Sequence, residues 1–170
     1  KIYYAKRLKL STTEYTYNGK TKKPTVKVYD YKGNRISSSN YTITYKDNKN
    51  VGKATVTIKL KGNYSGTLKA TFKIVPKETK VDKLTAAKKS LKVKIKKQSS
   101  QVTGYELQYS TSKKFTSSKT KKISSYKTTS VTLKSLKAKK TYYVRVRTYK
   151  TVNGVKYYSD WSTAKTKKTK

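Results

Sequence analysis

The chain has 170 residues, of which 44 are Lys or Arg and only seven are Asp or Glu, so its formal net charge is +37. It contains no His and no Cys, which excludes an imidazole base, a thiol nucleophile, a disulfide framework and soft metal ligands. The composition therefore predicts a non-catalytic protein with no metal site and no cofactor. Such a charge also makes polyanions natural partners.

The apolar residues argue against disorder in spite of this charge. The chain has 17 Tyr, together with many Val, Ile and Leu residues in alternating patterns, whereas disordered chains are poor in such residues. No apolar run approaches the roughly 18 residues of a membrane-spanning helix, so no membrane span is expected. Because the sequence starts at Lys1 and lacks Met, we interpret it as a processed protein or a fragment of a longer one.

Period-two alternation dominates the first half of the chain and predicts β-strands. Apolar residues alternate with Lys or Thr at 26–29, 41–45, 54–61 and 67–74. Gly- and Asn-containing turn signals separate these runs, and Pro76 ends the last of them because it lacks the N–H that a ladder requires. The polar residues 77–80 then indicate a short linker.

The motifs of this half are similar to those of a known family. They are Tyr17-Asn18-Gly19-Lys20, Asn40-Tyr41-Thr42-Ile43-Thr44-Tyr45, Gly62-Asn63-Tyr64-Ser65-Gly66 and Phe72-Lys73-Ile74-Val75-Pro76. Together they resemble the small Ig-like β-sandwich repeats of bacterial surface proteins. The resemblance implies a stalk, spacer or adhesive module.

A second series of alternating runs begins after the polar segment. It covers 91–96, 105–109, 131–133 and 142–151, and Asn153-Gly154 predicts a hairpin that joins the last run to 155–158. Several short strands at this spacing favour an antiparallel sandwich.

The spaced motifs of this second series resemble a fibronectin type III domain. They are Gly104-Tyr105-Glu106-Leu107-Gln108-Tyr109-Ser110, Tyr142-Tyr143-Val144-Arg145-Val146-Arg147-Thr148-Tyr149 and Tyr158-Ser159-Asp160-Trp161-Ser162. The resemblance implies that Leu136 and Tyr142 form a tyrosine corner. It also implies that Ile95 replaces the Trp usual on the second strand.

These patterns and resemblances predict an all-β chain of two tandem antiparallel β-sandwiches, the first Ig-like and the second fibronectin type III-like. The expected boundaries are 1–76 for the first domain, 77–80 for the linker and 81–170 for the second domain with its basic C-terminal tail. The resemblances place the chain outside the cell or on a bacterial cell surface.

The second half carries the candidate binding residues. Lys and Arg follow exposed strand phases and crowd the loops, and Tyr143 and Tyr149 are expected to point outward beside the two Arg residues. Arginine grips phosphate or sulfate with two parallel hydrogen bonds, whereas lysine offers a point charge. The predicted polyanion-binding residues are Lys92, Lys94, Lys96, Lys139, Lys140, Tyr143, Arg145, Arg147 and Tyr149.

The leading functional hypothesis is a binding or adhesion module that attaches electrostatically to a cell-wall polymer, a glycosaminoglycan or nucleic acid without reading sequence. The alternatives are a module that binds a host extracellular protein, such as an immunoglobulin or a matrix component, and a passive spacer whose charge serves only solubility. The strand phases further predict that Glu106 pairs with Arg145 or Arg147.

Overall fold

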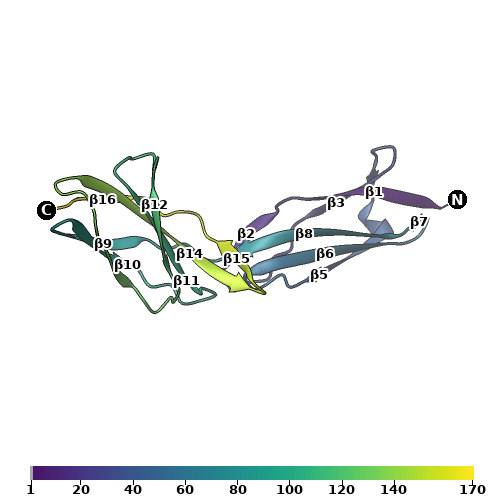
Figure 1. Ribbon diagram of the computed structural model, residues 1–170. Helices are drawn as coiled ribbons and strands as arrows, with labels where there is room; N and C mark the ends of the chain where they lie inside the picture. The colour runs from purple at the N-terminus through teal and green to yellow at the C-terminus, as the bar shows by residue number, and fades with distance from the viewer. Residues whose placement is uncertain (1) are drawn as a thin grey trace. The chain divides into compact units, whose positions relative to one another are not determined.

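The computed structural model describes residues 2–170 and confirms the predicted all-β chain. Over this range it has 16 strands and one helical element, the three-residue 3-10 turn Ser38–Asn40, so no helix there is long or apolar enough to cross a bilayer. The chain divides into two compact units, Lys1–Val75 and Pro76–Lys170, each made of two sheets (Figure 1). The expectation of two tandem β-sandwiches is therefore confirmed.

The first unit has two four-stranded sheets, with strand orders β4-β3-β1-β7 and β2-β8-β6-β5. The strands are β1 (Tyr3–Leu10), β2 (Glu14–Thr16), β3 (Val26–Asp30), β4 (Arg35–Ile36), β5 (Tyr41–Lys46), β6 (Gly52–Leu60), β7 (Tyr64–Ser65) and β8 (Thr67–Val75). The long ladders are antiparallel, and two short pairings, β1 with β7 and β2 with β8, are parallel.

The core of the first unit follows the alternation of its central strands. Val56 and Ile58 of β6 are fully buried, as is Ile74 of the neighbouring β8. The pattern is less strict on β5, where Ile43 was expected to face the core but remains 38% exposed. The reason is that β5 lies at the edge of its sheet, where fewer neighbours cover a side chain.

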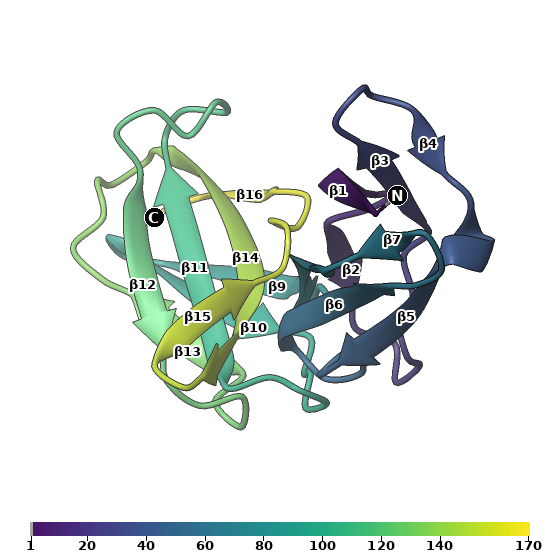
Figure 2. The same cartoon turned by 90° about the vertical axis from the view of Figure 1, so that its right-hand side faces the viewer.

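The second unit combines a three-stranded sheet, β13-β10-β9, with a larger sheet of order β12-β11-β14-β15, in which β16 also pairs with β14 (Figure 2). The strands are β9 (Val81–Ala87), β10 (Ser90–Ile95), β11 (Gly104–Ser110), β12 (Lys119–Ile123), β13 (Ser130–Leu133), β14 (Thr141–Val152), β15 (Val155–Tyr158) and β16 (Lys165–Lys168). The Asn153-Gly154 hairpin between β14 and β15 is present as predicted.

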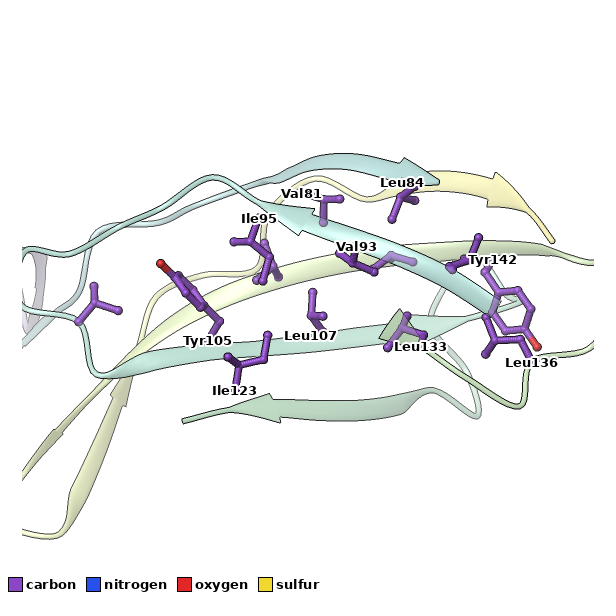
Figure 3. Packing of buried hydrophobic residues seen from close by; sticks show 14 residues of the cluster. Val81, Leu84, Val93, Ile95, Tyr105, Leu107, Ile123, Leu133, Leu136 and Tyr142 are labelled. Atoms are coloured by element: carbon purple, nitrogen blue, oxygen red, sulfur yellow. The ribbon is translucent and has the colours of Figure 1, made fainter. Parts of the chain in front are cut away.

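Apolar side chains from both sheets of the second unit meet in one core (Figure 3). Val93 and Leu107 are fully buried near its middle, and Ile95 of β10 is only 2% exposed. Leu136 and Tyr142 lie together at one end, and the Tyr142 hydroxyl accepts a hydrogen bond from the Lys137 N–H at 3.0 Å. This contact ties the loop before β14 to the strand, as expected for a tyrosine corner.

The predicted linker residues 77–80 make several hydrogen bonds within the second unit. The Thr79 hydroxyl donates to the Lys96 carbonyl, and the Thr148 hydroxyl donates to the Lys77 carbonyl at 2.8 Å. Thr79 itself is buried. These contacts fix the course of the segment along the second unit.

Tyr105 carries the most heavily bonded hydroxyl in this core. Its side chain is fully buried, and its hydroxyl accepts from the Gln98 N–H at 2.9 Å and lies 3.1 Å from the Gln98 carbonyl and 3.0 Å from the Tyr126 carbonyl. Burial raises the pKa of Tyr105, so the hydroxyl stays a donor at neutral pH. It thereby joins the loop after β10 to the loop after β12.

Replacing Tyr105 by Phe is expected to destabilise the second unit by about 1–3 kcal/mol, because the ring stays while buried backbone partners lose their bond. The measurement is urea unfolding followed by Trp161 fluorescence, which reports only the second unit since the chain has one Trp. The control is Tyr157→Phe, because Tyr157 lies in the β15 hairpin and is only half-buried. Equal stability of the two variants would contradict the assigned role.

Candidate functional site

The predicted polyanion-binding residues lie in three places on the second unit rather than on one surface. Lys92 and Lys94 lie on β10, followed by Lys96; Tyr143, Arg145, Arg147 and Tyr149 lie on β14; and Lys139 and Lys140 lie in the turn before β14. Since β10 and β14 belong to different sheets of the sandwich, the first two groups occupy different faces.

The lysines of β10 form an exposed row on the three-stranded sheet. Their neighbours Leu91, Val93 and Ile95 point into the core, so alternation turns Lys92, Lys94 and Lys96 toward solvent. The Lys94 ammonium lies 3.9 Å from the Asp82 carboxylate, with both side chains about half exposed. Lys96 also borders a shallow hollow of about 390 Å³, together with Lys77 and Lys80.

Arg145 and Arg147 are not free cations on an open face, because aromatic rings enclose both guanidinium groups. The Arg145 guanidinium carbon lies 4.0 Å from the ring centroid of Phe115 and 4.9 Å from that of Trp161. The Arg147 guanidinium carbon lies 4.3 Å from Trp161 and 3.9 Å from Tyr158. We call Phe115, Arg145, Trp161, Arg147 and Tyr158 the aromatic ladder.

Two serine hydroxyls place Trp161 in this ladder. Beside the middle of β14, the Ser159 and Ser162 hydroxyls accept hydrogen bonds from the N–H groups of Thr148 at 3.0 Å and Val146 at 3.1 Å. The Ser159 and Ser162 N–H groups donate in turn to the carbonyls of the same two residues. The two serines thus pair with the backbone N–H and carbonyl groups of Val146 and Thr148. Trp161, which lies between the serines in sequence, packs against the two arginine side chains of β14.

Polar partners on β11 hold the two guanidinium groups from the other side. The predicted ion pair is confirmed: Arg147 Nη2 lies 2.5 Å from Glu106 Oε1, and Arg147 Nε donates to the same oxygen at 3.0 Å. Arg145 Nε donates to Gln108 Oε1 at 2.7 Å. Burial, and then the neighbouring charge of Arg147, lower the pKa of Arg145.

The expectation that Tyr149 points outward is wrong, whereas Tyr143 is half-exposed. Tyr149 lies in the predicted strand phase but is only 2% exposed. Tyr158 covers it with ring centroids 6.0 Å apart, and the Lys122 ammonium lies 5.5 Å from its ring centroid. Burial raises the pKa of Tyr149, and its hydroxyl donates to the Ile123 carbonyl at 3.4 Å.

Lys122 and Lys156 form a cation pair on this sheet that sequence reasoning missed. The neighbouring Lys156 lowers the pKa of Lys122. The two residues lie on β12 and β15, and no sequence motif connects these two edge strands.

Lys139 and Lys140 belong to a larger cluster at one end of the second sandwich. Three segments meet there: the β9–β10 turn, the loop before β14 and the C-terminal residues. We call their exposed lysines the basic pole, which consists of Lys88, Lys89, Lys137, Lys139, Lys140, Lys168 and Lys170. Residues 87–90, 136–140 and 168–170 contain no Asp or Glu.

Hydrogen bonds hold the three segments of the basic pole together. The Lys89 N–H donates to the Lys170 carbonyl at 3.1 Å, and the Leu136 N–H donates to the Lys89 carbonyl at 2.9 Å. Thr169, only 4% exposed, lies between them, and its hydroxyl donates to the Lys137 carbonyl at 2.6 Å. The lysine backbones are therefore fixed, while their charged ends extend into solvent.

The acidic side chains of the described residues are scattered rather than clustered. Between residues 2 and 170 there is no cluster of three or more His, Cys, Asp or Glu side chains that could hold a metal ion. The best-enclosed carboxylate in an ion pair is that of Glu106, which Arg147 engages.

Two solved structures of multidomain fragments resemble this chain. The FN1–FN3 domains of chicken CNTN1 share 13% identity, with a TM-score of 0.50, and the match covers 99% of this chain and 67% of that one. A titin crystal structure also shares 13% identity, with a TM-score of 0.43 and coverage of 97% and 67%. At this identity the CNTN1 likeness concerns the fold alone. No curated protein matches the sequence.

The sequence itself matches a family over residues 75–165, which is more than half of the chain and contains the aromatic ladder. That family is the fibronectin type III domain. Its members are generally non-catalytic and typically serve as binding or spacer modules, commonly in extracellular or surface proteins. The sandwich topology, the tyrosine corner and this match agree, and the chain belongs to the fibronectin type III family.

Proposed function

We propose that the chain is a binding module of a secreted or bacterial surface protein, with an Ig-like repeat preceding the fibronectin type III domain, and that it attaches electrostatically to polyanions. The observation that carries this proposal is the basic pole. Its lysines come from three segments far apart in the sequence, and those segments are hydrogen-bonded into one fixed scaffold. A polyanion contacting it gains affinity by displacing its own counterions.

The charge distribution supports the second unit as the main attachment site. Residues 76–170 contain 27 Lys and Arg against four Asp and Glu, while residues 1–75 contain 17 against three. Solubility of a small domain requires a net charge of only about 2–8. A cluster of like charges without a carboxylate among them costs stability, so its assembly on one rigid end favours an anionic partner.

The binding is expected to be weakly selective. Lysine ammonium groups contact phosphate, sulfate or carboxylate as point charges and do not read a base edge. Lys92, Lys94 and Lys96 would supply a secondary contact on the other face. Arg145, Arg147 and Tyr143 remain part of the proposed surface, but their substitution also removes ladder contacts, so lysine variants give the cleaner test.

The test compares three triple variants of the full chain, each of which removes three positive charges from exposed residues. The pole variant is Lys137→Gln, Lys139→Gln and Lys140→Gln; the strand variant is Lys92→Gln, Lys94→Gln and Lys96→Gln; and the control is Lys113→Gln, Lys114→Gln and Lys127→Gln. Heparin and duplex DNA affinities are measured between 50 and 300 mM salt.

The pole variant is expected to lose about tenfold in affinity at low salt, and its slope of log affinity against log salt should flatten by about 2–3, since each phosphate contact contributes about 0.9. The strand variant should lose less, and the control least. Equal losses of affinity in all three variants would contradict the proposal, because they would show that binding depends on net charge alone and not on the basic pole. A serum protein that stays bound at high salt, while polyanions do not bind at all, would replace it with the host-protein alternative.

A further inference from the structure

The first unit carries two of the four arginines of the chain, and both lie on the outer face of one sheet. Strand β3 pairs with β1 on one side and with β4 on the other, which places Tyr29 opposite Arg7 and also opposite Arg35. The next residues along these strands, Val28 and Ile36, are buried. By alternation the Arg7–Tyr29–Arg35 row therefore faces outward, and both arginines are exposed.

A second cationic row runs beside the first. Lys9 of β1 lies directly opposite Lys27 of β3, two residues from Arg7 and Tyr29 along the strands, which is about 7 Å at the usual strand rise. Like charges directly opposite each other destabilise a sheet. Four cations thus lie around one Tyr side chain; we call Arg7, Lys9, Lys27, Tyr29 and Arg35 the cationic face.

No carboxylate of the described residues compensates these charges. The three ion pairs found between residues 2 and 170 are Lys73–Glu14, Lys94–Asp82 and Arg147–Glu106. Asp30 follows Tyr29 in sequence, but its carboxylate accepts hydrogen bonds from the N–H groups of Lys32 and Asn34 at 2.8 and 2.9 Å. It is therefore committed to the β3–β4 turn, and the cationic face stays uncompensated.

A hollow beside the cationic face indicates which kind of anionic partner could bind there. Next to Lys9, Lys27 and Tyr29 lies a hollow of about 170 Å³ whose far side is formed by Ser11 and Thr25. Hydroxyls of this kind can bond to sugar hydroxyls. The Arg7 guanidinium carbon lies 4.7 Å from the Tyr29 ring centroid, so this cation occupies one face of the ring.

We propose that the cationic face of the first unit is a binding site for a sulfated polysaccharide, separate from the basic pole and not dependent on it. Arg7 and Arg35 would each grip a sulfate group with two N–H donors, an arrangement that a guanidinium group provides and an ammonium does not. Lys9 and Lys27 hold the next sulfate group along the polysaccharide, and the hollow receives a sugar unit beside Tyr29.

The test uses the full chain with the pole substitutions Lys137→Gln, Lys139→Gln and Lys140→Gln already present, so that binding at the pole does not mask the first unit. Into this background we would introduce Arg7→Gln with Arg35→Gln. The matched control is Lys59→Gln with Lys69→Gln, which removes two exposed charges from the other sheet of the same unit. A third variant, Arg7→Lys with Arg35→Lys, keeps the charge but loses the paired donors.

Titration calorimetry with a sulfated heparin octasaccharide should show about a tenfold loss for the Arg-to-Gln variant, a loss under about threefold for the control, and an intermediate loss for the Arg-to-Lys variant. Circular dichroism checks that all variants fold. Equal losses for the Arg-to-Gln variant and the control would overturn the proposal. The proposal would also be overturned if the protein bound a desulfated octasaccharide as tightly as the sulfated one. The same holds if the Arg-to-Gln variant, but not the control, lost as much affinity for single-stranded DNA as for heparin.

These outcomes separate the site from the proposed function of the second unit. If the pole substitutions alone leave heparin binding unchanged, the role of the basic pole fails. The cationic face is then still judged by the difference between the Arg-to-Gln variant and its Lys59/Lys69 control, because both are measured in the same background.

Discussion

Replacing Gly104 by Ala is expected to destabilise the second unit by about 3 kcal/mol or more, beyond the usual cost of an extra methyl group in a packed core. A Cβ at this position would lie 2.1 Å from the Ile123 carbonyl oxygen and 2.9 Å from the Tyr149 hydroxyl. The first contact is with backbone, so β11 and β12 would have to separate. Displacing the hydroxyl would also break its hydrogen bond to Ile123.

Urea unfolding monitored through Trp161 fluorescence measures this loss in the second unit. The matched control is Gly154→Ala: Gly154 has a φ of +79°, and a Cβ added there would meet nothing within 4 Å, so its replacement costs only the left-handed strain of about 1–2 kcal/mol. The assignment of Gly104 as a close-approach residue fails if the two variants unfold at the same urea concentration.

Replacing Trp161 by Ala is expected to destabilise the second unit by about 2–4 kcal/mol. The ring contacts both guanidinium groups of the aromatic ladder, and each such contact contributes about 0.5–2 kcal/mol in addition to the buried area of the ring. The first unit should keep its own melting temperature. Calorimetry measures this effect, since the variant lacks the only fluorescent indole.

Phe115→Ala provides the comparison for Trp161, because the Phe115 ring contacts one guanidinium group, that of Arg145. Its loss should cost about half as much. Amide hydrogen exchange adds a local measurement: the N–H groups of Val146 and Thr148, bonded to Ser162 and Ser159, should exchange faster in the Trp161 variant alone. A Trp161 variant as stable as the Phe115 variant would show that the ladder is not a stabilising unit.

Alternation in the sequence predicted β3, β6, β8, β10, β11 and β14 and the contacts that follow from their phase, but not β1, which lies between β3 and β7. The Glu106–Arg147 pair is the clearest case, since register alone brings the two residues opposite each other. The edge strands β12 and β16, with sequences KTKKI and KTKK, were not predicted. At an edge, both faces of such a Lys- and Thr-rich strand remain wet, so its sequence has no apolar period.

The phase of a strand predicts which face of the sheet a side chain lies on, but not whether other segments cover that side chain. It put Tyr149 on the outer face of β14, but Tyr158 and Lys122 come from other strands and cover it. The basic pole depends in the same way on three segments that meet only in the folded chain. The cationic face was not predicted from the sequence, because β4 has only two residues, Arg35 and Ile36. Two residues are too few to show a strand period.

The two kinds of cation in this chain differ in how their side chains are held. Each of the four arginines has an aromatic neighbour: Arg7 and Arg35 flank Tyr29, and Arg145 and Arg147 flank Trp161. The chain has 40 lysines, and those between residues 2 and 170 lie mostly at exposed positions. Acetylation of exposed lysines can therefore change the charge of the surface without loss of packing, whereas Arg7, Arg145 and Arg147 each contact a ring whose packing lysine would not reproduce.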